Sequence, residues 1–231
     1  MFKHGSDWRV PIARWAVWDA CASEQGTPAA SDLGFVEPML RRRLGLQARM
    51  ALRVAHDCAP DPGELRMVYA SRHGELGRST SMLEALAAGE EVSPTAFSTS
   101  VLSASVGLFS ILQRNTAAST AISAGAASFG YGLLEACLQL ADDPDQPVLL
   151  VYADEPLPDV YGSAAPDHDA AHAVGLLLQR EASMQLTCRL SRGDGNPSAE
   201  PQSRAFVRCL ETGQSRWDTA GACWTWSTQA S

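Results

Sequence analysis

The stretch that decides the fold is STAISAGAASFGYG, residues 119–132. Its first half is a short apolar run that predicts a buried strand, and Gly125 marks a turn before a nearly all-apolar helix. Strand, turn and helix in this order place a residue at a helix N-terminus, where many α/β enzymes hold a nucleophile. The residue placed there is Ala126 or Ala127, and neither methyl side chain can attack a substrate.

Outward from this stretch, strand and helix patterns alternate. Strands are expected over 65–70, 120–124, 147–153, 172–179 and 183–190, and helices over 38–58, 79–88, 101–113, 128–141 and 205–210. The short link at 180–182 predicts that the last two of these strands form an antiparallel pair. Pro94 disfavours helix at Ser93, so residues 92–97 are expected to be extended or looped. Trp224 and Trp226 alternate with polar residues, which places both on one face of a strand. The sequence therefore predicts an α/β fold with a mixed sheet.

Length and composition limit the classes of protein to consider. The 231 residues, 45% hydrophobic and 19% charged, predict one globular domain over 1–231, with a core at about 36–192 on which the terminal segments pack. A net charge of −8 repels phosphate, so nucleic acid is not an expected partner. The lack of a run that resembles a membrane span or signal peptide favours a cytoplasmic protein. The six cysteines show no CxxC spacing, so we expect reduced thiols, no metal and no cofactor.

Residues 93–153 resemble the N-terminal half of the β-ketoacyl-ACP synthases of the thiolase superfamily. SPTAF at 93–97 and the residues up to Gly107 are similar to the family's SP-x-x-F segment, and NTAAS at 115–119 takes the place of its G-P-S turn. Residues 119–130 take the place of the elbow S-x-x-x-x-x-A-C-x-S-G. With the later strands, the resemblance covers roughly residues 65–181. It implies a thiolase-like half domain with a mixed five-stranded sheet packed by helices.

The chain departs from the family pattern at the positions of the family's catalytic residues. Ala126 aligns with the nucleophilic cysteine, a shift of one residue would put Gly125 there, and the asparagine of N-x-x-x-G becomes Ser103. We expect the two catalytic histidines and the rest of the oxyanion-hole wall to be absent from this half-length chain. Condensation needs a thiolate and donors that stabilise a carbanion. The resemblance therefore implies no catalytic residue and no condensation by this chain alone.

Ketosynthase-like proteins without the cysteine include the chain-length factors, which pair with an active synthase, and a half-length class that accompanies aryl-polyene and related pigment pathways. The resemblance implies such a heterodimer, in which this chain stabilises an active β-ketoacyl-ACP synthase and shapes its acyl tunnel. Acyl carrier protein is a further candidate partner. The family dimerises through the strand before the elbow, whose open edge invites pairing; here it comprises Thr120, Ala121, Ile122, Ser123 and Ala124. The residues that approach the partner's tunnel correspond to Thr95, Ala96 and Phe97.

A second interpretation, a stand-alone serine hydrolase or acyltransferase, rests on Ser128. The pattern G-x-x-S-x-G at 125–130 is similar to the hydrolase elbow G-x-S-x-G, although the additional residue moves the serine into the helix. The base and the acid that orients it would come from His168 or His172 and from Asp167 or Asp169.

Overall fold

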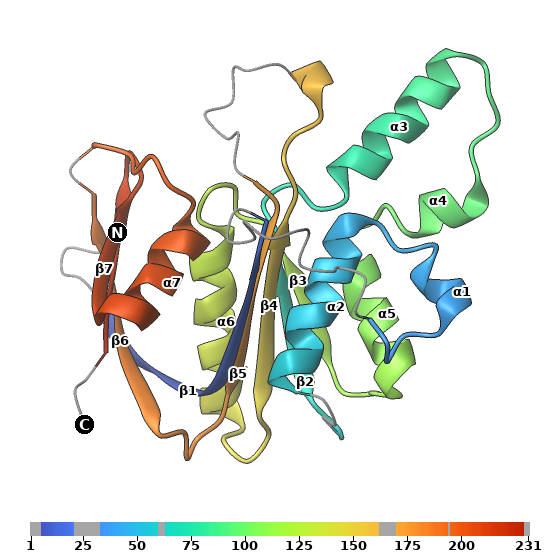
Figure 1. Ribbon diagram of the computed structural model, residues 1–231. Coiled ribbons are helices and arrows are strands. Elements are labelled where there is room, and N and C mark those ends of the chain that lie inside the picture. The colour runs from blue at the N-terminus through green and yellow to red at the C-terminus, as the bar shows by residue number, and fades with distance from the viewer. Residues whose placement is uncertain (1–5, 21–32, 60–62, 162–169, 194, 229–231) are drawn as a thin grey trace.

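The computed structural model describes residues 6–20, 33–59, 63–161, 170–193 and 195–228 (Figure 1). These residues form one mixed sheet with helices on both of its faces. The strand order is β3-β2-β4-β5-β1-β6-β8-β7. The expected α/β class is confirmed, but the described sheet has eight strands rather than five, because both terminal segments add strands to it.

The parallel part of the sheet lies at one edge. β2 (Arg66–Ala70) pairs in parallel with β3 (Ser119–Ile122) on one side and with β4 (Val148–Asp154) on the other. All seven residues of β4 are buried, as its unbroken apolar run predicts for a strand covered on both faces. β3 is the edge strand.

The antiparallel part is built around one long strand, β1 (Ser6–Asp19). Its second half pairs with β5 (His172–Leu178), and its first half pairs with β6 (Met184–Arg192) on the opposite side. The predicted pairing of these two strands with each other is therefore wrong. β1 is long enough to separate them, and the short link carries the chain from one side of β1 to the other near Ile12.

The C-terminal segment continues the antiparallel part. β8 (Ala222–Thr228) pairs with β6, and β7 (Gln214–Asp218) forms the second edge of the sheet. Trp224 and Trp226 are both buried on one face of β8, as predicted. The hydrophobic core thus extends beyond residues 36–192 to the strands near both termini.

Helices cover the two faces in separate layers. α1 (Pro38–Arg41), α2 (Leu46–Cys58) and α5 (Ala104–Gln113) lie on one face, and α6 (Ser128–Asp142) and α7 (Gln202–Thr212) lie on the other (Figure 1). Successive residues of β4 alternate between the two layers, with Leu149 packed under α2 and Leu150 under α6. The single helix expected over 38–58 is interrupted between Arg41 and Leu46.

A helical arm extends beyond the carboxyl ends of the parallel strands. It consists of α3 (Leu76–Ala87) and α4 (Pro94–Ser98), and the short 3-10 helix η1 (Asp159–Tyr161) lies nearby (Figure 1). The expectation of an extended or looped segment at 92–97 is wrong for the residues that form α4. Pro94 takes the first helical position, where its fixed φ suits a helix, and the Ser93 hydroxyl accepts a hydrogen bond from the Ala96 N–H. Within the described ranges, no helix has the length and hydropathy to cross a membrane.

Candidate functional site

The candidate site begins at the turn between β3 and α6. Gly125 has a φ of +58°, a conformation that glycine adopts without strain, so the predicted glycine turn is confirmed. The Ser128 hydroxyl donates to the Gly125 carbonyl oxygen at 2.7 Å and accepts from the Ala124 N–H at 2.8 Å. These two hydrogen bonds close the turn and fix the start of α6 at Ser128.

Ala126 lies at the tip of this elbow. It is exposed to solvent, whereas Ser128 is fully buried. A thiol at the tip would have its pKa lowered by the N-terminus of α6, but a methyl group has neither a proton to lose nor a lone pair to donate. The fold therefore builds the elbow and leaves it without a nucleophile at its tip.

The residues proposed for a serine hydrolase are not brought together in the described part of the chain. The Ser128 hydroxyl is occupied by the turn, and the Nε2 of His172 lies 2.6 Å from the Oγ of a different serine, Ser203. Both members of the His172–Ser203 pair are buried, and burial lowers the pKa of His172. His168, Asp167 and Asp169 lie outside the described residues. Ser203 belongs to α7, which lies far from β5 in the sequence. No local sequence pattern could therefore predict its contact with His172.

A buried carboxylate organises the end of the parallel sheet. Asp154, the last residue of β4, accepts hydrogen bonds from the Ser71 hydroxyl at 2.7 Å, from the Arg72 N–H at 2.9 Å and from the His73 N–H at 3.1 Å. The Ser71 hydroxyl in turn accepts from the Gly74 N–H at 2.8 Å. Asp154 thus holds the turn from which α3 starts. Asp154 lies at the carboxyl end of a buried parallel strand, and this position in the sequence could have identified it as a candidate site residue.

Gln47 joins α2 to the same cluster. Its side-chain amide donates to the Tyr69 hydroxyl at 2.9 Å and to the Ser71 hydroxyl at 3.0 Å, and its backbone N–H donates to the Glu155 carboxylate. Burial of Glu155 raises the pKa of its carboxyl. The cluster is therefore a framework that sets the base of the helical arm. Within the described residues, no group of three His, Cys, Asp or Glu side chains is placed to hold a metal ion.

The residues predicted for the dimer interface form the open edge of the sheet and the turn after it. Thr120, Ala121 and Ile122 belong to β3, which pairs with β2 on one side, while Ser123 and Ala124 are exposed in the elbow. Helices flank this edge on both faces, and they carry exposed apolar side chains: Ile111 on α5 and Tyr131 and Leu138 on α6 are 73%, 41% and 57% exposed. Among the described residues, a strand edge with no further strand beside it, flanked by exposed apolar side chains, is thus present at the predicted position.

The residues predicted to face a partner's tunnel lie on α4. The Phe97 side chain is 67% exposed. Ala96 lines a groove between α3 and the segment 91–96, with a volume of about 470 Å³, which we name the α3–α4 groove. Thr95 lines a smaller, neighbouring pocket of about 100 Å³. The pocket and the groove share three lining residues, Gly45, Glu75 and Arg78.

Comparisons with known proteins place this geometry in a family. A family model described as "Beta-ketoacyl synthase, N-terminal domain" matches residues 15–227. No curated protein matches the sequence. Among solved structures, a chain from the complex of the ketosynthase ApeO with its chain length factor ApeC from Xenorhabdus doucetiae is 26% identical, with a TM-score of 0.82 over 95% of this chain and 99% of that one.

Two further structures are more distant. The ishigamide ketosynthase/chain length factor is 13% identical, with a TM-score of 0.61 over 88% of this chain and 72% of that one. A β-ketoacyl synthase from Burkholderia phymatum STM815 is 14% identical, with a TM-score of 0.57 over 87% of this chain and 62% of that one. The fold is the thiolase-like fold of the ketosynthases. The family model matches residues 15–227, which is nearly the whole chain. The chain therefore belongs to the β-ketoacyl synthase N-terminal domain family.

Proposed function

We propose that this chain is a non-catalytic ketosynthase-like subunit that pairs with an active β-ketoacyl-ACP synthase, stabilises it and shapes its acyl tunnel. The products belong to fatty-acid, polyketide or polyene biosynthesis. The observation that carries the proposal is Ala126, an exposed methyl group at the tip of a fully formed elbow. The structure from X. doucetiae supports the assembly, because the similar chain is one member of a ketosynthase–chain length factor complex and the alignment covers 99% of it.

The open edge of β3 supports the mode of pairing. An unpaired strand forms hydrogen bonds with a second strand at little conformational cost, and the apolar side chains on both sides of it become buried when it does. Ile111 and Leu138 are more than half exposed in the chain by itself. Their burial against a synthase would remove an apolar surface that a monomer in solution seldom keeps.

Co-expression with each β-ketoacyl synthase of the source organism tests the pairing. The complex is purified through a tag on the synthase and analysed by size-exclusion chromatography with mass detection. We expect a one-to-one heterodimer with one of these synthases, and this chain alone is expected to aggregate or self-associate. A well-behaved monomer that binds none of the synthases would contradict the proposal.

The Ala126→Cys variant tests the non-catalytic role separately. Because Ala126 is exposed at the elbow tip, the introduced thiol is expected to react with iodoacetamide. We expect no decarboxylation of malonyl-ACP and no condensation, since a thiolate alone does not stabilise the carbanion. Activity of this variant in the absence of a synthase would show that the cysteine is all that the chain lacks.

The tunnel-shaping role makes a prediction about product length. Phe97 is the best probe, because its exposed ring contributes little to the packing of this chain. In the heterodimer, Phe97→Ala is expected to deepen the tunnel and lengthen the acyl products, as measured by mass spectrometry of the released chains. Leu83→Ala, at a residue that is similarly exposed on α3, is the control. Equal product lengths for both variants would exclude Phe97 from the tunnel.

A further inference from the structure

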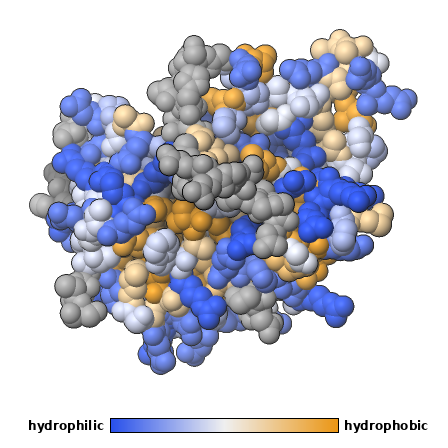
Figure 2. All heavy atoms as spheres, in the orientation of Figure 1, coloured by the Kyte–Doolittle hydropathy of each residue, from blue (hydrophilic) through white to orange (hydrophobic). Residues whose placement is uncertain are grey.

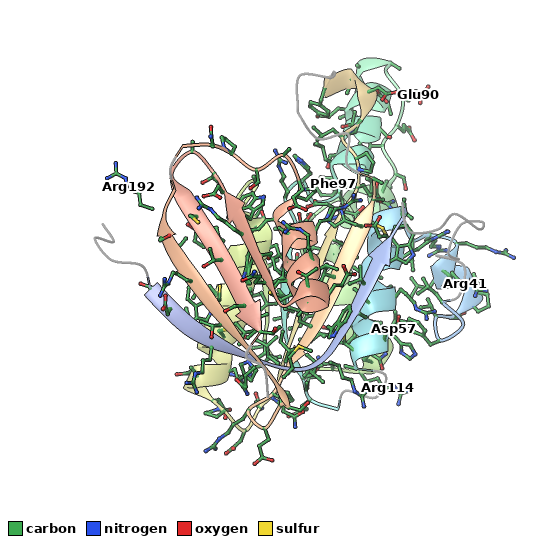
Figure 3. All side chains as sticks on the ribbon, turned by 60° about the vertical axis from the view of Figure 1, so that its left-hand side comes forward. Arg41, Asp57, Glu90, Phe97, Arg114 and Arg192 are labelled. Atoms are coloured by element: carbon green, nitrogen blue, oxygen red, sulfur yellow. The ribbon has the colours of Figure 1, made fainter. Side chains whose placement is uncertain are left out.

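The helical arm is poorly supported by the rest of the chain. α3 has 12 residues, and Thr80 is its one buried residue. Isolated helices of this length are marginal in water, because most helix stability in proteins comes from packing of one face. The arm projects from the body, and Glu90 lies at its outer end (Figures 1 and 3). Much of the surface of α3 is therefore available to a partner.

One face of α3 forms a wall of the α3–α4 groove. The segment 91–96 also lines the groove, and Gly45 and Leu46 at the start of α2 complete the lining together with Glu155. The apolar residues that line the groove are Leu46, Met82, Ala85, Val92 and Ala96. In the space-filling view, hydrophobic and polar residues are mixed along this arm (Figure 2). A groove of about 470 Å³ has room for a few side chains of another protein.

The charges in the groove are not balanced. Glu75, Glu91 and Glu155 line it together with a single cation, Arg78. The Arg78 Nε lies 3.6 Å from the Glu75 carboxylate, and burial raises the pKa of both Glu75 and Glu155. A second cation in the groove would stabilise these half-buried carboxylates in their charged form.

We propose that the α3–α4 groove is a docking site for a segment of the synthase subunit that presents a Lys or Arg side chain between apolar side chains. The inference rests on the proposed function and adds to it a contact separate from the β3 edge. An acyl chain fits the groove less well, because it brings no cation to the three carboxylates. An acidic carrier protein would add negative charge where the groove already has an excess.

A charge-reversal pair tests the electrostatic part. Glu91→Lys places a cation at the groove, whereas Glu84→Lys makes the same change in net charge at an exposed residue of α3 that does not line it. The affinity for the synthase is measured by biolayer interferometry at low and high salt. We expect Glu91→Lys to weaken binding by about tenfold at low salt and less at high salt, with Glu84→Lys near wild type. Equal effects of the two variants would overturn the proposal.

A steric pair tests the groove itself. Ala85→Trp fills it, and Ala87→Trp adds the same side chain to an exposed residue of α3 outside the lining. We expect the first to weaken binding by more than about tenfold and the second to leave it unchanged, while circular dichroism shows that both variants stay folded. Loss of binding with Ala87→Trp alone would place the contact on the other face of α3.

The outcomes separate the two proposals. If the wild-type chain binds no synthase, the proposed function fails. If the wild-type chain binds and both groove variants bind equally well, the function stands and the groove is not a docking site. If both groove variants bind weakly and both controls bind normally, the groove contributes to the interface.

Discussion

Single residues in this chain decide which side chain the elbow presents at its tip and which one closes its turn. Ser128 stands two residues after the elbow tip, and both of its hydrogen bonds are used to close the turn. From the sequence alone, it is a candidate nucleophile. In the fold, it is a buried residue with a structural role, and Ala126 takes the exposed position.

Replacement of Ser128 tests this role. Ser128→Ala removes both hydrogen bonds of a fully buried hydroxyl, each worth about 0.5–1.5 kcal/mol, so we expect a loss of about 1–3 kcal/mol in the free energy of unfolding. Urea denaturation provides the measurement. The control is Ser98→Ala, where an exposed hydroxyl bonds the Thr95 carbonyl oxygen and little change is expected. Comparable losses in the two variants would argue against a special role for Ser128.

The buried His172 predicts how stability depends on pH. Burial lowers its pKa, although the nearby Asp154 carboxylate acts in the opposite direction. The unfolded chain therefore takes up a proton below about pH 6.5 that the folded chain excludes. Stability is then expected to fall as the pH drops below about 6.5 and to be insensitive to His172 above it.

Urea denaturation of His172→Gln at several pH values checks this dependence. The variant is expected to be less stable overall but to show a shallower slope below about pH 6.5 than the wild type. Burial also lowers the pKa of His73, so a double variant with His73→Gln is expected to have the shallowest slope. An unchanged slope in both variants would mean that other groups determine the acid response.

At the scale of elements, local patterns located most helices and strands, and contacts between distant segments decided the rest. The strand–turn–helix at 119–132 follows from apolar periodicity and one glycine, and it forms as predicted. α4 is different, because Pro94 is compatible with both a loop and a first helical turn. The sequence pattern therefore could not choose between them.

The contact between α6 and the sheet predicts a matched pair of glycine variants. A Cβ at Gly132 would lie 2.7 Å from the Ala70 Cβ and 3.2 Å from the Leu150 Cδ1, whereas a Cβ at Gly107 in α5 would meet nothing within 4 Å. We expect Gly132→Ala to lower the free energy of unfolding by about 1–3 kcal/mol. Gly107→Ala is expected to raise it by up to about 1 kcal/mol, as for other helical glycines. Thermal denaturation of both variants provides the measurement. A change of the same sign in the free energy of unfolding of the two variants would contradict the prediction.

At the scale of the whole molecule, the two edges of the sheet differ in their surroundings. β3 is short and flanked by exposed apolar side chains on α5 and α6. β7, at the other end, follows directly after α7, and most of its residues are buried. We therefore propose that the partner binds on the β3 side of the molecule.

Hydrogen exchange compares the two edges within one sample. Addition of the synthase is expected to slow amide exchange in β3 by at least about tenfold, because new strand pairing protects the edge amides. Exchange in β7 is expected to stay the same and serves as the internal control. Protection of β7 without protection of β3 would move the interface to the opposite edge.

The sequence by itself determined the elements that depend on neighbouring residues: the elbow, its missing nucleophile, the buried strand β4 and the apolar face of Trp224 and Trp226. Periodicity and turn chemistry act over a few residues, so they can be read from one chain. Only the tertiary structure decided that β1 separates β5 from β6, that the sheet has eight strands, and that His172 pairs with Ser203. These contacts join segments far apart in the sequence, and many alternative pairings satisfy the same local patterns until the whole core is packed.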